Sequence, residues 1–434
     1  MGFRFTRCCC GFGTLYVQWT LFNDPNTELW LTRVSPSTGS ILWDVKLADH
    51  YSTDQVFHRG LAINSNGEAI TCNGKIVSPE GEILSTLTND VSDLVDTAAT
   101  ISRTFSDVVV DVDDKIYFQE NFGSGTNYLS TLPILAAFRY SADGQTPEEW
   151  YAADNRSPDG AFSDGDENIV YSLQQITLDV GNLSGSNPAL LTGGCRIGVY
   201  GGTFTDPATD IYAERYFEFA TTGGDPVRQI ASQYSHDIYD GDATYSQWRR
   251  SNTRSIRADY LGRAVFGGEY IYDSLTPIPG PDTPNFLGHL WCGSAGALSF
   301  VIDFSDGVWG ESGGGASPIV ECVRTGRRAE IYVVVYDFGS RRGPGVVDPD
   351  DGEQYSLFRI RSTSPPVLLW KLKSSEFPVI PAMDVDSSSG DCFAGHRTAS
   401  QDLFSRLRAS NGEVRWTTEH FADGLIHAVA HRAV

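Results

Sequence analysis

Short apolar strands separated by polar turns recur along the whole chain. In one pattern, an apolar strand that contains an arginine leads through a turn into a strand ending in tryptophan, as in Leu29–Trp43 and Leu403–Trp416. Ten residues separate the arginine from the tryptophan in both segments. Glycine in these turns supplies the positive φ that a tight reversal needs, so each segment predicts a β-hairpin. Two further copies end at Trp150 and Trp370.

A second pattern consists of two apolar strands joined by a turn, usually with glycine. It covers residues 61–72, 108–118, 256–266 and 382–395. The two patterns together give four strands per unit, and one unit spans the 46 residues from Trp370 to Trp416. Repeated four-stranded units of this length predict the blades of an all-β propeller.

The two ends of the chain each provide part of a unit. Residues 426–432 read as a first strand without the rest of its blade, and residues 15–21 begin in the middle of one. Pairing of these segments would close the ring and remove exposed sheet edges. We therefore expect one domain, a single closed β-propeller over residues 15–434, preceded by an N-terminal arm over residues 1–14. About seven four-stranded blades fit best, with eight as the alternative.

The turn-Gly-x-x-x-Trp arrangement resembles the tryptophan-docking repeat of the quinoprotein-like superfamily of PQQ-type and WD-like propellers. The resemblance covers about half of the chain and lies at the level of single repeats. It implies that four tryptophans dock neighbouring blades on one another: Trp43, Trp150, Trp370 and Trp416. Because the resemblance concerns blades, it does not by itself imply a quinone cofactor.

Charge and composition narrow the classes of partner. The formal net charge is −23, and such an acidic surface repels nucleic acid. Only five of the 32 basic residues are lysine, which fits a saline habitat or a GC-rich genome. No apolar run reaches the ~18 residues of a membrane span, and no apolar stretch follows Arg4 and Arg7 as in a secretory signal. We expect a protein of the virion or the cytoplasm.

Cysteine and aspartate supply two candidate sites. Cys8, Cys9 and Cys10 are consecutive, and we interpret them as an arm that docks on a partner; a metal site and plain buried or reduced thiols are the alternatives. The loop with Asp384, Asp386 and Asp391 is similar to a calcium-binding loop, although its glycine is displaced by one position. The alternative is a solvated turn, and no other cofactor is expected.

Aromatic residues in a polar stretch form the third candidate, a recognition loop for a glycan or a protein surface: Tyr234, Tyr239, Tyr245 and Trp248. Packing of this loop onto the propeller is the alternative. The chain contains neither HExxH nor a G-x-S-x-G elbow nor a P-loop.

A non-enzymatic role follows as the leading hypothesis: a structural component of a virion or phage tail that binds neighbouring subunits or a surface glycan. The alternative is a quinoprotein-like dehydrogenase or a glycan-active enzyme that uses the propeller channel.

Overall fold

Antiparallel strands and short turns make up the part of the chain that the computed structural model describes, and no helix occurs there. The described residues are 13–23, 26–49, 60–87, 105–111, 113–121, 135–145, 147–153, 177–181, 189–198, 212–220, 228–231, 247–259, 261, 263–274, 286–294, 297–304, 309, 319–326, 329–337, 354–373, 377, 379–398, 401–422 and 424–433. No helix in these ranges could cross a lipid bilayer.

The described strands form seven four-stranded sheets, numbered here in chain order. Sheet 1 contains β28 (Gly424–Arg432), β1 (Thr14–Asn23), β2 (Asn26–Val34) and β3 (Ile41–Ala48). Sheet 2 contains β4 (Leu61–Ile63), β5 (Ala69–Thr71), β6 (Lys75–Val77) and β7 (Ile83–Thr86). Sheet 3 contains β8 (Phe105–Val110), β9 (Ile116–Asn121), β10 (Leu135–Tyr140) and β11 (Pro147–Ala153).

The later sheets follow the same strand order. Sheet 4 contains β12 (Thr177–Gly181), β13 (Ala189–Gly198), β14 (Tyr212–Ala220) and β15 (Arg228–Ala231). Sheet 5 contains β16 (Gln247–Ala258), β17 (Ala264–Ser274), β18 (Phe286–Ser294) and β19 (Ala297–Asp303). Sheet 6 contains β20 (Ile319–Gly326), β21 (Glu330–Asp337), β22 (Gln354–Arg361) and β23 (Val367–Leu372). Sheet 7 contains β24 (Val379–Val385), β25 (Cys392–Arg397), β26 (Asp402–Leu407) and β27 (Val414–Thr418).

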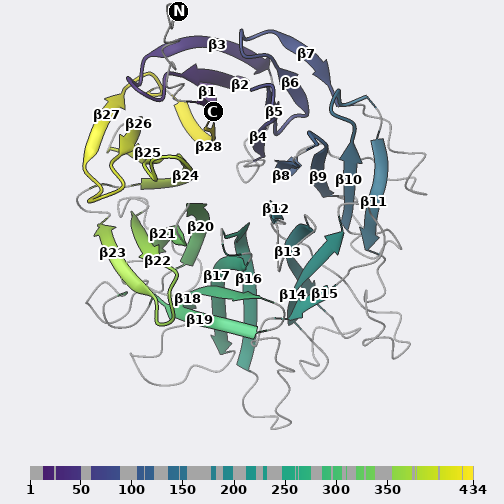
Figure 1. Ribbon diagram of the computed structural model, residues 1–434, viewed down its shortest axis with the longest axis vertical. Coiled ribbons are helices and arrows are strands. Elements are labelled where there is room, and N and C mark those ends of the chain that lie inside the picture. Colours follow the sequence, from purple (N-terminus) through teal and green to yellow (C-terminus); the bar gives the residue numbers. More distant parts are fainter. Residues whose placement is uncertain are drawn as a thin grey trace, which may run out of the picture.

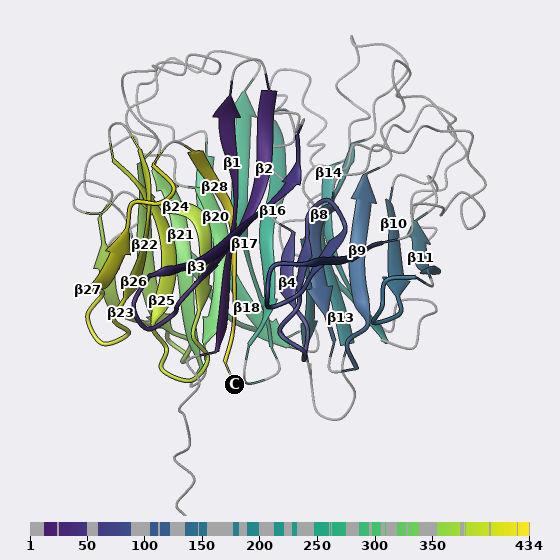
Figure 2. The ribbon, with the colours of Figure 1, turned by 90° about the horizontal axis from the view of Figure 1, so that it is seen from above.

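These sheets stand around a common centre, which is the arrangement of a propeller-type fold (Figure 1). The first strand of each sheet lies nearest the centre and contacts the first strand of the next sheet, in the order β28, β4, β8, β12, β16, β20, β24 and again β28. Figure 2 shows the strands running from one face of the molecule to the other, with the C-terminal end at one face.

Sheet 1 is built from both ends of the chain. Strand β28 pairs antiparallel with β1, from Thr14 opposite Arg432 to Leu21 opposite Gly424, with one bulge at Gln18/Trp19. Glycine is required at residue 13, because its φ is +77° and a Cβ there would lie 2.2 Å from the carbonyl oxygen of Arg432. The two ends of the chain are therefore held in one sheet.

The hydrophobic core lies between neighbouring sheets. Each of the main buried clusters draws side chains from two sheets: sheets 7 and 1, 1 and 2, 5 and 6, and 6 and 7. Phe393 of sheet 7 and Leu15 of sheet 1, for example, are both fully buried in one cluster. Burial also raises the pKa of the Cys392 thiol well above its usual value, which disfavours its thiolate form. Packing thus joins adjacent sheets through their faces.

An Asx turn repeats where the first strand of a sheet turns into the second. The side-chain Oδ1 atoms of Asn64, Asp111 and Asp259 each accept hydrogen bonds from the backbone N–H groups two and four residues later. Asp386 similarly accepts the N–H groups of Ser388 and Ser389. Side-chain capping of this kind satisfies the donors of a tight turn and fixes the point at which each inner strand ends.

Candidate functional site at the central cavity

A cavity of about 330 Å³ lies at the centre of the molecule, lined by residues from six inner strands: β4, β8, β16, β20, β24 and β28. Its lining residues include the whole of the short strand β4 and belong to the last part of the other five strands, so the cavity lies toward the face where the inner strands end. Concave sites at the meeting point of several strands are where ligands commonly bind, and this volume is at the small end of the usual range.

In five of the inner strands, one position contributes much of the chemistry of the lining. It is the position two residues before the capping side chain of the turn, and it holds Ala62, Val109, Arg257 and Asp384 in β4, β8, β16 and β24. In β20 the same cross-strand row begins at Arg324, which pairs with Tyr332. Sheets 2 and 3 therefore place small apolar residues on the cavity, and sheets 5, 6 and 7 place charged ones.

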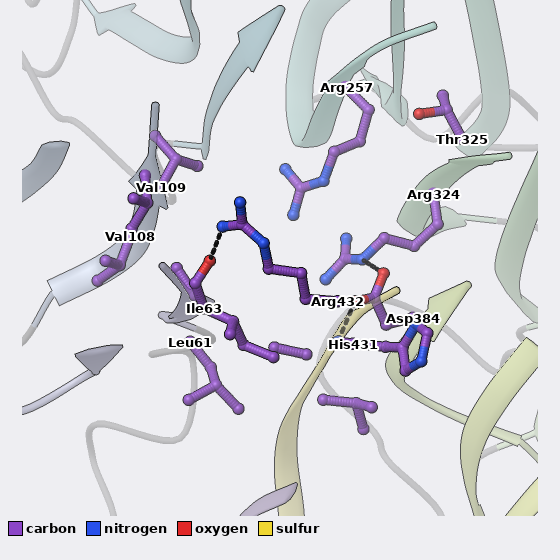
Figure 3. Close-up of a pocket in the computed structure, with 14 residues that line it drawn as sticks. Leu61, Ile63, Val108, Val109, Arg257, Arg324, Thr325, Asp384, His431 and Arg432 are labelled. Carbon is purple, nitrogen blue, oxygen red and sulfur yellow. Dashed lines mark hydrogen bonds and ion pairs between the residues drawn. The ribbon is translucent and has the colours of Figure 1, made fainter. Parts of the chain in front are cut away.

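Three arginines, from three different strands, line the charged part of the cavity. Figure 3 shows the side chains of Arg257, Arg324 and Arg432 directed toward the same space. The Nη1 atom of Arg432 donates to the carbonyl oxygen of Ile63 at 3.0 Å, and that of Arg324 donates to the carbonyl oxygen of Val323 at 2.9 Å. A guanidinium group has five N–H donors, so one bond to a carbonyl holds it in place and still allows it to bind an anion.

Asp384 connects two of these strands. Its Oδ2 atom accepts the backbone N–H of His431 at 2.6 Å, and its Oδ1 atom lies 3.7 Å from Nε of Arg324. The ring of His431 packs on Phe393, with 4.9 Å between ring centroids. The carboxylate thus fixes the end of β28 against β24 and orients the Arg324 side chain.

Apolar side chains line the other part of the cavity. Leu61 and Ile63 come from β4, and Val108 and Val109 come from β8; Figure 3 shows them across the cavity from Arg257 and Arg324. Leu61 and Val108 are buried, so Ile63 and Val109 provide the accessible apolar surface, and the guanidinium groups favour a ligand with an anionic group and a small apolar body. In a chain with a formal net charge of −23, such a cluster of arginines gives an anion a local site of opposite potential.

The candidate calcium residues separate into two places. Asp384 faces the cavity, whereas Asp386 and Asp391 flank the guanidinium group of Arg406 at 3.5 and 2.8 Å. Asp391 also binds Nε of Arg415 at 2.7 Å. Burial opposes ionisation of Asp386, but hydrogen bonds from Ser388 and Ser389 outweigh it and lower the pKa. Among the described residues, no three His, Cys, Asp or Glu side chains are grouped as metal ligands would be.

The remaining predicted site residues fall mostly outside the described part of the chain. Cys8, Cys9 and Cys10 of the arm lie outside it, as do Tyr234, Tyr239 and Tyr245 of the aromatic stretch. Trp248 belongs to β16 and Trp150 to β11, but only the backbone of these two residues is described. The arm and the recognition loop remain predictions.

The other three tryptophans predicted to dock blades extend from the outer strand of one sheet to the hairpin turn of the next. Their Nε1 atoms donate to backbone carbonyl oxygens: Trp43 to Pro79 at 2.8 Å, Trp370 to Ala409 at 2.8 Å and Trp416 to Pro36 at 3.0 Å. The same three carbonyls accept hydrogen bonds from the arginine opposite each tryptophan: Arg33, Arg359 and Arg406.

Two sets of residues were missed by sequence reasoning. The docking arginines had a visible signal, because each stands ten or eleven residues before its tryptophan. The cavity arginines had a weaker one: Arg257 stands two residues before a turn-capping Asp, but this position acquires meaning only once the inner strands are placed around the centre.

No protein-family model matches this chain, and no curated protein matches its sequence. Several solved structures are similar to it in shape. Hydrazine synthase of Kuenenia stuttgartiensis is 10% identical over 88% of this chain and 92% of that chain, with a TM-score of 0.47. AztD of Citrobacter koseri is 9% identical (96% and 98% covered, TM-score 0.43), and the Dos1 propeller is 12% identical (91% and 79%, TM-score 0.41).

The class of the protein is defined by its own architecture: an all-β chain of four-stranded antiparallel sheets around a centre, with a cavity where the inner strands end. This is a propeller-type fold, and such folds serve many unrelated functions. Function must therefore be argued from the side chains of the site.

Proposed function

We propose that this chain is a closed seven-bladed β-propeller that acts as a binding module, and that its central cavity takes a small organic anion with an apolar body. The guanidinium groups of Arg257, Arg324 and Arg432 would bind the anionic group. Ile63 and Val109, which are partly exposed, would contact the apolar body. The closed ring is supported by the cyclic order of contacts among the inner strands, from β28 through β24 and back.

The single observation that carries the proposal is the placement of the three arginines from β16, β20 and β28 on one small cavity. Guanidinium groups bind carboxylates and phosphates through paired N–H donors, and these bonds strengthen where water is partly excluded. Among the described lining residues, Asp384 is the one carboxylate, so these residues do not assemble the acid pair that glycoside hydrolysis needs. We accordingly propose binding and name no reaction.

The roles predicted from the sequence extend this proposal to the assembly in which the module would act and to the kind of ligand. A structural component of a virion or tail could carry such a module, and the arm with Cys8 to Cys10 would then attach it to neighbouring subunits. A glycan with acidic groups would fit the chemistry of the cavity. The quinoprotein-like alternative has no separate observation in its favour among the described residues.

Phenyl phosphate is a direct probe, because it joins an apolar ring to a doubly charged anionic group. We expect isothermal titration of the full chain to show saturable binding that weakens as salt rises, because added ions screen the guanidinium groups. In the Arg324→Gln variant, affinity should fall by about tenfold or more, because one charged donor is lost and the Asp384 carboxylate then faces the ligand.

A matched control is Arg408→Gln, which removes the same charge from a half-exposed residue whose ion partner is Glu413, away from the cavity. Its affinity for phenyl phosphate should equal that of the unmodified chain. Equal loss in both variants would show a general charge effect and contradict the proposal, as would binding of neutral benzyl alcohol with the same affinity as phenyl phosphate.

A further inference from the structure

A second cavity lies between sheets 2 and 3, and it shares no lining residue with the central cavity. Its volume is about 670 Å³, and it opens to solvent beside β7 and the turn that follows β10. Its lining includes Glu68, Ile76, Leu84, Ser85, Asp143 and Gln145. The register of the strands explains why a hollow exists at this point.

In sheets 1, 6 and 7, one cross-strand row carries an aromatic residue, an arginine and a tryptophan in its last three positions. In sheet 7, for example, Phe393 is opposite Arg406, which is opposite Trp416. The same row in sheet 2 consists of Ile70, Ile76 and Ser85. Serine therefore stands where the other three sheets place the docking indole, and isoleucine stands where they place the arginine.

At the docked interfaces the acceptor is the carbonyl of the residue directly after the first residue of the turn, and its counterpart in sheet 3 is Ala142, which lines the cavity. The Oγ atom of Ser85 donates to the carbonyl oxygen of Asp143, in the hairpin turn of sheet 3, at 3.2 Å. The Nε2 atom of Gln145 donates to the same oxygen at 3.3 Å. Both contacts are longer than the bonds of 2.8–3.0 Å that the indole N–H groups of Trp43, Trp370 and Trp416 make.

The apolar floor of an indole slot is also present. Where Trp43 and Trp416 dock, their rings cover the turn glycines Gly81 and Gly39 of the next sheet. At Gly144 of sheet 3, that cover comes from Leu87 and Ile76, whose methyl groups lie 2.8 and 2.9 Å from the position of an added Cβ. Leu87 thus covers Gly144 as Leu372 covers Gly412 beside the docked Trp370, and the cavity is lined by Ile76 and by residues of β7 and the turn of sheet 3.

From these observations we infer that the cavity between sheets 2 and 3 is a docking slot for a tryptophan side chain supplied by a partner protein. The indole ring would lie against Ile76 and Leu84, and its N–H would donate to the carbonyl oxygen of Ala142, the counterpart of the docking carbonyls of the other interfaces. The carboxylates of Glu68 and Asp143 favour a basic residue beside that tryptophan, as the chain's own docking tryptophans each have an arginine opposite them. This inference does not depend on the proposed ligand of the central cavity.

A short peptide with one arginine and one 5-fluorotryptophan, separated by a serine, tests the slot on the full-length chain. We expect the fluorine resonance of the peptide to shift and broaden saturably when the protein is added. The Ser85→Trp variant should abolish this change, because its own indole fills the slot, whereas Ser85→Thr should preserve it. Arg324→Gln should bind the peptide normally, which separates this slot from the central cavity.

A second blocking variant does not depend on whether Ser85→Trp folds. Leu84 is 50% exposed, so Leu84→Lys changes the slot without disturbing the core, and the new cation should weaken peptide binding roughly tenfold. The inference is overturned if the peptide does not bind, or if Ser85→Trp and Leu84→Lys bind it as the unmodified chain does. Binding of N-acetyltryptophanamide with the same affinity as the peptide would overturn the assignment to a protein partner.

Discussion

Two interfaces between sheets have the same strand pairing but different side chains. One lies between sheets 7 and 1, and the other lies between sheets 2 and 3. At the first, Arg406 and Trp416 both donate to the carbonyl oxygen of Pro36, and the indole ring covers Gly39. At the second, Ile76 and Ser85 occupy the equivalent positions, and a cavity of about 670 Å³ remains. Four-stranded pairing is preserved in both places.

This difference shows that docking chemistry and sheet formation are separable. Sheet 1 joins the two ends of the chain, so its contacts with sheet 7 connect residues that are about as distant in sequence as the chain allows. Ordering such distant segments has a high entropic cost, and strong side-chain contacts offset it. Sequence separation alone does not decide where the docking set occurs, because Trp43 and Trp370 dock on turns that are close to them in sequence.

The largest effect is expected from Arg406→Met at the closing interface. Arg406 is buried, with 8% of its side chain exposed, and it pairs with Asp386 and Asp391. Removing it leaves buried carboxylates without this partner, so the free energy of unfolding should fall by about 3–5 kcal/mol. Urea denaturation followed by tryptophan fluorescence measures this change.

The matched variant at the other interface is Ile76→Met, at the same row position of sheet 2. A swap between apolar side chains of similar volume should cost less than about 1.5 kcal/mol. If Ile76→Met destabilises the chain as strongly as Arg406→Met, the docking side chains do not make the interface between sheets 7 and 1 the more strongly stabilised of the two.

Truncation of the indole gives the next largest effect. Trp416 packs on Phe393 and Phe404, with ring centroids 6.1 and 5.8 Å away, and donates to Pro36. Because Trp416 is only partly buried, we expect Trp416→Ala to lower the free energy of unfolding by roughly 3 kcal/mol, the low end of the range for such truncations. Ser85→Ala should change it by no more than about 0.5 kcal/mol, measured in the same urea series. Similar losses in both variants would contradict the comparison.

The fold was predictable from local sequence because its unit is local. Each hairpin of Leu29–Trp43 type carries its own turn glycine, apolar alternation and terminal tryptophan, so strand pairing within a sheet could be predicted without knowing the neighbours. Strand boundaries in residues 169–337 were less predictable, because tryptophan-ended hairpins are missing there and the patterns are weaker.

The central cavity was not predictable, because its chemistry arises only when distant strands meet. Arg257, Arg324 and Arg432 are separated by long stretches of chain, and each alone is an ordinary strand arginine. The loop with Asp384, Asp386 and Asp391 was difficult for another reason. Its sequence suggests a cation site, yet Asp386 and Asp391 pair with Arg406, a residue from a neighbouring strand that no local pattern connects to them.

The smallest effect concerns a tyrosine hydroxyl that belongs to the same docking row. Tyr16 donates to the carbonyl oxygen of Gly67 at 2.7 Å across the interface between sheets 1 and 2, whereas the row of sheet 2 has Ile70 at this position. Tyr16→Phe removes one neutral hydrogen bond and should lower the free energy of unfolding by about 1 kcal/mol at neutral pH. Ile70→Val serves as the matched variant for packing alone.

The same residue gives the comparison a pH dependence. Burial raises the pKa of Tyr16 to about 12, above the value near 10 of an unfolded tyrosine. The unfolded chain therefore loses this proton first, and the stability that Tyr16 contributes is complete below pH ~10 and is lost as the pH rises toward ~12. Urea midpoints measured across this range should fall less steeply for Tyr16→Phe than for the unmodified chain. An unchanged slope would show that the hydroxyl of Tyr16 is not held in its neutral form by the interface between sheets 1 and 2.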